Sequence, residues 1–105
     1  MSYEATAIAQ SIRRLLMERP STRLREISTT LGVERHTATR CLLRVFGTSF
    51  RQLQSECLVT RREALRQQGA TLKEIAFRLG YSSAEVMSKR YRHSTGILSA
   101  SVDRK

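Results

Sequence analysis

The chain has 105 residues, which is enough for one small domain or for two fused lobes of about 50 residues each, neither burying much apolar surface alone. Its 19 Lys and Arg residues outnumber 9 Asp and Glu residues, the net charge is +10, and 16 of the 19 are Arg. Arg binds phosphate and guanine through paired hydrogen bonds, so the composition favours a nucleic-acid partner. It disfavours a membrane partner, because no stretch approaches the roughly 20 apolar residues that span a bilayer.

Catalytic and metal chemistry is also disfavoured. The sequence has no Gly-rich phosphate loop, no metal-ligand spacing and a single Asp, Asp103, so we expect neither an enzyme nor a bound cofactor. Cys41 and Cys57 each lie among apolar residues at helical spacing. We expect both thiols to be buried and reduced, as in a cytoplasmic protein, and a redox switch between them is the less favoured alternative.

Hydrophobic spacing predicts an all-α fold of about seven helices. Apolar residues recur every three to four positions, and most of these runs end at Pro or Gly. The expected helices cover, in chain order, residues 3–19, 23–30, 35–46, 50–68, 72–79 and 83–94, with a short seventh helix after Gly96. The helix over 50–68 would be about 27 Å long and would link a first lobe (3–47) to a second lobe (71–105) within one domain.

Three segments have the form of a capping box, in which Ser or Thr is followed three residues later by Glu or Gln. They are Ser49–Gln52, Thr71–Glu74 and Ser82–Glu85, and each precedes one of the expected helices. Glu34 stands before the helix over 35–46, and Glu is a poor N-cap. The start of that helix is therefore less well defined than the others.

The chain contains an internal repeat. The segment Leu24–Gly32 returns as Leu72–Gly80, 48 residues later, with Leu, Glu, Ile, Leu and Gly at the same places. Each copy has apolar residues at helical spacing, a Gly suited to a left-handed turn and then a second helical stretch, which is the pattern of a helix-turn-helix. Past the turn the offset is 49, and Thr39–Arg40 matches Ser88–Lys89. The second turn is therefore one residue longer.

The helix after each turn has an apolar and a polar face. The residues expected to point inward are Ala38, Leu42, Val45 and Phe46 in the first copy, and Met87 and Tyr91 in the second. The outward residues are then His36, Thr39, Arg40 and Leu43, and Glu85, Ser88, Lys89 and Arg92. Such a face fits the major groove, where Arg or Lys can bridge guanine O6 and N7. We expect Arg40 and Lys89 to be the principal base readers, and a merely solvated basic face is the alternative.

Motif elements in both halves resemble those of a known family. They are Glu74-Ile-Ala76, Leu79-Gly80-Tyr81-Ser82, Met87-Ser88-Lys89, Tyr91 and Thr95-Gly96-Ile97, with Leu31-Gly32-Val33, Arg40, Gly47 and Ser49-Phe50 in the first half. With these residues nearly the whole chain resembles the DNA-binding domain of the AraC/XylS family of bacterial transcription regulators. The resemblance implies a dumb-bell of seven helices whose two recognition helices enter successive major grooves of DNA.

The resemblance also implies which residues contact DNA. Its base-contacting positions fall on His36, Thr37, Thr39, Arg40, Ala84, Glu85, Ser88 and Lys89. Phosphate contacts are expected from Arg35, Arg44, Arg90, Arg92 and His93. For His36 a DNA contact and simple solvation are equally favoured. Arg61 and Arg62 are expected to be solvated, and a contact with phosphates between the lobes is the alternative.

The chain departs from the family pattern at several positions. The family usually has a bulky apolar residue at Ala38, an aromatic residue at Leu42, an Arg near Leu58 and a Pro near Ser99. The first lobe is therefore expected to pack less tightly and to bind DNA less strongly than the second.

The leading expectation is a sequence-specific regulator that binds double-stranded DNA as a monomer, acts as an activator and contacts RNA polymerase. The alternative is a protein-interaction module, sigma-like or anti-activator, that uses the same basic face on an acidic protein. Salt-dependent and sequence-selective retention of DNA would separate the two. The sequence leaves open the operator, the effector, and whether the chain stands alone or is the C-terminal part of a longer regulator.

Overall fold

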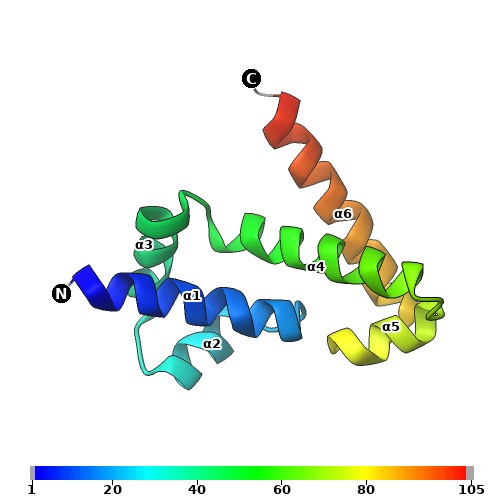
Figure 1. Cartoon of the computed structure of the whole chain (residues 1–105), viewed down its shortest axis with the longest axis horizontal. Helices are drawn as coiled ribbons and strands as arrows, with labels where there is room; N and C mark the ends of the chain where they lie inside the picture. Colours follow the sequence, from blue (N-terminus) through cyan, green and yellow to red (C-terminus); the bar gives the residue numbers. More distant parts are fainter. Residues whose placement is uncertain (1, 104–105) are drawn as a thin grey trace.

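The computed structural model describes the backbone of residues 2–103 and the side chains of residues 4–99. Within those residues it contains six helices and no strand (Figure 1). The helices are α1 (Ser2–Glu18), α2 (Leu24–Leu31), α3 (Arg35–Phe46), α4 (Phe50–Gln67), α5 (Leu72–Leu79) and α6 (Ala84–Asp103). The all-α prediction is confirmed, and the first five helices begin and end within one residue of their predicted bounds.

The prediction of a seventh helix is wrong, because α6 continues through Gly96 to Asp103. Three other glycines, Gly32, Gly47 and Gly80, have φ angles of 69°, 67° and 89° and end the helices before them, whereas Gly96 keeps helical geometry. Ile97 and the residue after it are partly buried, so continuing the helix covers apolar surface. That gain outweighs the roughly 1 kcal/mol that Gly costs inside a helix.

The buried side chains form two hydrophobic clusters. Cluster 1 lies among α1, α2, α3 and the first half of α4, and its fully buried residues are Ala9, Ile12, Leu16, Ile27, Ala38 and Leu42. Cluster 2 lies among α4, α5 and α6 and contains Leu58, Leu65, Ile75, Ala76, Leu79 and Met87. Each buried Leu or Ile side chain contributes about 1.5–3 kcal/mol relative to an exposed one.

Helix α4 takes part in both clusters. Leu53 and Cys57 belong to cluster 1, whereas Leu58 and Leu65 belong to cluster 2. The change from cluster 1 to cluster 2 falls between two adjacent residues. Helix α4 therefore packs one face of its first half into cluster 1 and a different face of its second half into cluster 2. The ribbon in Figure 1 accordingly shows α1, α2 and α3 at one end of α4 and α5 at the other.

The sequence repeat is a structural repeat. Helices α2 and α5 have eight residues each and begin at Leu24 and Leu72, 48 residues apart. Helices α3 and α6 begin at Arg35 and Ala84, 49 residues apart, so the second turn has one residue more. Here the pair α2–α3 is called unit 1 and the pair α5–α6 unit 2.

Side-chain caps start both helices of unit 2. Thr71 Oγ1 accepts a hydrogen bond from the Glu74 N–H at 3.1 Å, and the Glu74 carboxylate accepts one from the Thr71 N–H at 2.8 Å. This reciprocal pair is the predicted capping box. The box predicted from Ser82 is wrong by one residue, because Ser83 Oγ accepts from the Val86 N–H at 3.1 Å and α6 begins after Ser83.

Candidate nucleic-acid interface

Helix α3 presents a polar face on the side opposite cluster 1. Ala38 and Leu42 have no exposed surface, which turns the predicted reading residues outward. His36 and Arg40 are exposed, and Thr37 and Thr39 are half-buried. Leu43, predicted to point outward, is 53% exposed, but Phe46, predicted to point inward, is 38% exposed. Phe46 lies in the last turn of α3, where cluster 1 no longer covers it.

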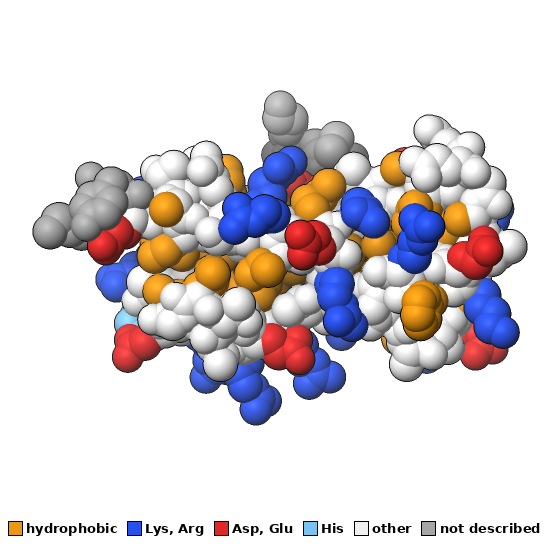
Figure 2. Space-filling model, turned by 60° about the horizontal axis from the view of Figure 1, so that its bottom comes forward, with side chains coloured by type: hydrophobic (Ala, Val, Ile, Leu, Met, Phe, Trp, Pro, Cys, Tyr) orange, Lys and Arg blue, Asp and Glu red, His pale blue; other side chains and the backbone are white. Residues whose placement is uncertain are grey.

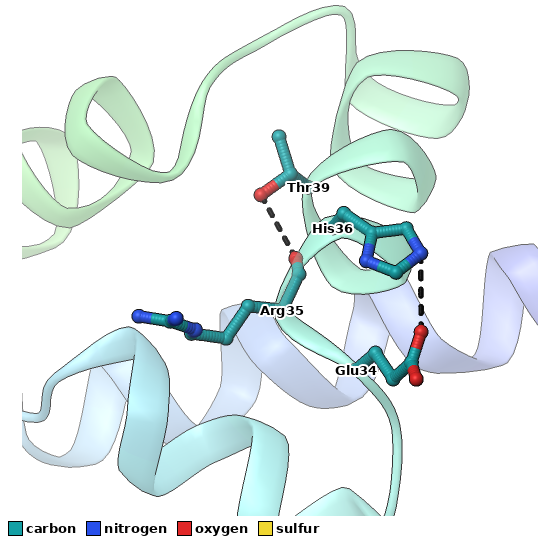
Figure 3. A network of polar contacts seen from close by, with 4 residues as sticks. All are labelled: Glu34, Arg35, His36 and Thr39. Carbon is teal, nitrogen blue, oxygen red and sulfur yellow. Dashed lines mark hydrogen bonds and ion pairs between the residues drawn. The ribbon is translucent and has the colours of Figure 1, made fainter.

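The start of α3 carries two local polar contacts, drawn in Figure 3. Thr39 Oγ1 donates a hydrogen bond to the backbone oxygen of Arg35, one turn earlier, at 3.0 Å. The Glu34 carboxylate lies 3.1 Å from His36 Nε2, and both side chains are largely exposed. Glu34 makes no cap bond to the helix backbone, as its residue type predicted. Its carboxylate therefore lies beside the exposed polar face of α3.

Helix α6 presents the equivalent face in unit 2. Met87, the counterpart of Ala38, has no exposed surface. Glu85 and Lys89 are exposed, and Ala84 and Ser88 are half-buried. Arg40 and Lys89 thus occupy equivalent places on two equivalent helices, each on an exposed face above a buried one.

The predicted phosphate-binding residues flank these faces, and all five are exposed: Arg35, Arg44, Arg90, Arg92 and His93. His93 has a partner within the protein, because an Nη of Arg51 lies 2.7 Å from its Nε2. Arg51 lies on α4, 42 residues away along the chain, and was not a sequence candidate. No local pattern could have found it, because only the packing of α6 on α4 brings the two side chains together.

Basic side chains are spread along the molecule. Figure 2 shows Lys and Arg at both ends and in the middle of one face, with Asp and Glu side chains between them. A basic surface of this extent attracts a long polyanion along its length.

Comparison with known protein families shows which family the two helix-turn-helix units belong to. A family model described as a helix-turn-helix domain matches residues 27–104. The chain belongs to the AraC-type helix-turn-helix family. The family resemblance seen in the sequence is therefore confirmed, and with it the assignment to DNA-binding transcription regulators.

A solved structure shares the fold of this AraC-type domain. It is the C-terminal domain of AraT, a response regulator from Geobacillus stearothermophilus, with a TM-score of 0.67 and 22% sequence identity. The alignment covers 85% of this chain and 77% of that one. No curated protein matches the chain in sequence.

Two Arg residues of α4, predicted to be solvated, make contacts inside the AraC-type domain. Arg61 Nη1 donates to the backbone oxygen of Met17 at 3.1 Å, and the Arg62 guanidinium carbon lies 3.9 Å from the centroid of the Tyr91 ring. The Tyr91 hydroxyl donates to Glu63 at 2.8 Å, and this hydrogen bond raises the pKa of Tyr91. Both Arg side chains therefore help to position helices around α4, and the solvation prediction is wrong.

Both thiols are buried and unpaired, as predicted for reduced cysteines. Burial raises the pKa of Cys57 to about 11, although the nearby Arg13 opposes the shift. A thiol of that pKa stays protonated at neutral pH, and the thiolate is the species that reacts with oxidants. This environment argues against Cys57 as a redox switch.

Two further features concern metals and membranes. Among the described residues, no group of three or more His, Cys, Asp or Glu side chains could hold a metal ion. Over the same part of the chain, none of the helices combines the length and apolar character needed to cross a bilayer.

Proposed function

We propose that this AraC-type domain recognises specific double-stranded DNA sequences by inserting α3 and α6 into successive major grooves. The observation that carries the proposal is the pair of equivalent faces. Arg40 and Lys89 project from faces that lie over the fully buried Ala38 and Met87. Arg and Lys reach guanine O6 and N7 in the major groove, and Thr39 and Ser88 can meet neighbouring base edges.

The two hydrophobic clusters would be the cores of two lobes, residues 3–47 and 71–105, and α4 would be the linker between them. The 18 residues of α4 extend about 27 Å. The molecule measures 43 × 35 × 21 Å along its principal axes. Successive major grooves on one side of B-DNA lie about 34 Å apart, a distance that a molecule of this length can span.

Two reading units in one chain suit a monomer on an asymmetric site, and we assign the domain to an activator that contacts RNA polymerase. A protein contact of this kind would use an exposed apolar side chain. Phe77 on α5 is 84% exposed, and its counterpart in unit 1 is the polar Thr29, so the repeat does not itself require an aromatic residue there.

Selection from a randomised duplex library over a salt series tests the proposal. We expect a bipartite motif whose halves lie one helical turn apart. Arg40→Ala should erase one or two base preferences in one half, Lys89→Ala should do so in the other, and each should weaken binding by about 1–3 kcal/mol. Arg14→Ala, which removes an exposed Arg from α1, is the matched control and should leave the motif intact.

Two outcomes would contradict this assignment. If Arg40→Ala and Lys89→Ala lowered affinity equally on every sequence, both side chains would be phosphate contacts and not base readers. If the unmodified domain enriched no sequence and lost all binding near physiological salt, the basic faces would instead serve an acidic protein partner.

A further inference from the structure

The turn between α1 and α2, residues 19–22, is bound to the middle of α4. Gln54 Nε2 donates to the backbone oxygens of Pro20 and Thr22 at 2.9 and 3.0 Å. Two turns further along α4, Arg61 donates to the last turn of α1. One of these bonds satisfies a carbonyl in the last turn of α1, the other two satisfy carbonyls of the turn itself, and together they hold the turn in one place along α4.

The same turn touches unit 2. A Cβ atom added to Gly80 would lie 2.5 Å from Ser21 Oγ and 2.7 Å from Arg19 Nε. The ends of the Ser21 and Arg19 side chains therefore lie against the backbone of Gly80, and a Cβ atom at this position would make both side chains shift. Gly32, the counterpart of Gly80 in unit 1, has the same left-handed backbone but no atom within 4 Å of such a Cβ. The close approach is therefore special to unit 2.

The contact therefore joins the α1–α2 turn directly to the α5–α6 turn, in addition to the connection through α4. A cleft of about 730 Å³ lies beside it, and its lining includes Arg23, the residue before α2, and Arg90 of α6. Helix α4 packs into both clusters, so the units can move relative to each other only where α4 bends or their packing on it shifts. A second point of contact opposes such movement, because it closes a triangle of α4, the first turn and the second turn.

We propose that this inter-unit contact, formed by Arg19, Ser21, Gln54 and Gly80, holds α3 and α6 in one relative orientation and thereby sets the half-site spacing that the domain accepts. The effect on half-site spacing rests on the proposed binding of two successive major grooves. Adding one base pair moves a half-site by about 3.4 Å and turns it by about 34° around the DNA axis. Units held rigidly cannot follow that movement.

Two substitutions disrupt the contact from opposite sides. Gly80→Asn keeps a residue that tolerates positive φ but adds a side chain where Ser21 and Arg19 now lie. Gln54→Met keeps the length of the side chain and removes both hydrogen bonds. The matched controls are Gly32→Asn, at a left-handed glycine with open space around it, and Gln67→Met, at an exposed Gln of the same helix.

The first measurement does not involve DNA. Spin labels on Thr30→Cys in α2 and Lys73→Cys in α5, both exposed positions, report the distance between the units by pulsed electron paramagnetic resonance. We expect a single narrow distribution in the parent and in both controls, and a broadened or shifted one in Gly80→Asn and Gln54→Met. Identical narrow distributions in all five proteins would overturn the proposal.

The second measurement uses duplexes that carry the selected half-sites at the preferred spacing and at one or two base pairs more. The parent and the controls should strongly prefer one spacing. In the two contact variants the ratio of the affinity for the preferred spacing to that for the longer spacings should fall at least about threefold, and the affinity for an isolated half-site should stay unchanged. Unchanged preference in both variants would overturn the link to spacing. A parent that binds no bipartite site would instead refute two-groove binding, and the label distances would still decide whether the contact orders the units.

Discussion

Unit 1 and unit 2 have the same arrangement, but their second helices, α3 and α6, begin differently. Ser83 caps α6 with its hydroxyl, whereas Glu34, at the same place before α3, makes no cap bond and lies beside His36. Both helices nevertheless form, and each buries the residue four positions after the cap, Ala38 or Met87. The comparison teaches that buried side chains and the turn define the unit, while the cap only adjusts its stability.

Helices α3 and α6 also end differently, although both have glycine at the equivalent place. Gly47 has a φ of 67° and ends α3, and two residues later Ser49 caps the start of α4. Gly96 lies inside α6 and the helix continues. Glycine therefore permits a helix to stop but does not compel it.

The strongest test of equivalence is to remove the same buried side chain from each unit. Ile27 and Ile75 are counterparts with no exposed surface, in cluster 1 and cluster 2. We expect Ile27→Ala and Ile75→Ala each to lower the free energy of unfolding by about 2–5 kcal/mol, measured by denaturant titration. Thr30→Ala and Arg78→Ala, at exposed counterparts in α2 and α5, are the controls. A near-neutral result at either Ile would break the equivalence.

The two glycines at equivalent places should respond to alanine with opposite signs. Gly47→Ala puts a side chain at positive φ and should destabilise the domain by about 1–2 kcal/mol. Gly96→Ala should stabilise it by about 0.5–1 kcal/mol, because alanine is the better residue inside a helix. Neither new Cβ would contact a neighbouring group within 4 Å, so the change in thermal stability reports only the conformational preference of the backbone at each position. If both substitutions changed the stability in the same direction, the different roles assigned to the two glycines would be contradicted.

The caps provide the smallest and most local test. Thr71→Ala removes a cap from α5 and should cost about 1 kcal/mol. Glu34→Ser supplies a hydroxyl that α3 now lacks and should gain about 0.5–1 kcal/mol. Because it also removes a carboxylate from beside the reading face, Glu34→Ser should tighten DNA binding at low salt, as measured by titration of a labelled duplex. A loss of stability in Glu34→Ser would show that Glu34 supports α3 in another way.

Local patterns predicted most of the fold and the composition of the candidate interface. The bounds of α3 and α5, the repeat offsets and the capping box at Thr71 all follow from residues within a few positions of one another. The exposed faces that carry Arg40 and Lys89 follow from helical spacing, because burying one side of a helix exposes the other. Their contacts with bases remain predictions.

The contacts that the sequence did not predict join residues far apart in the chain. Arg61 bonds a residue 44 positions away, and Arg51 meets His93 across 42 positions.

Sequence alone therefore determined the first five helices, the two repeated units and most of the residues that face outward, because each is set by short-range periodicity and turn chemistry. Only the tertiary structure decided how those units sit against each other. The approach of Ser21 to Gly80 depends on where α4 carries the second unit, and no local spacing encodes that position.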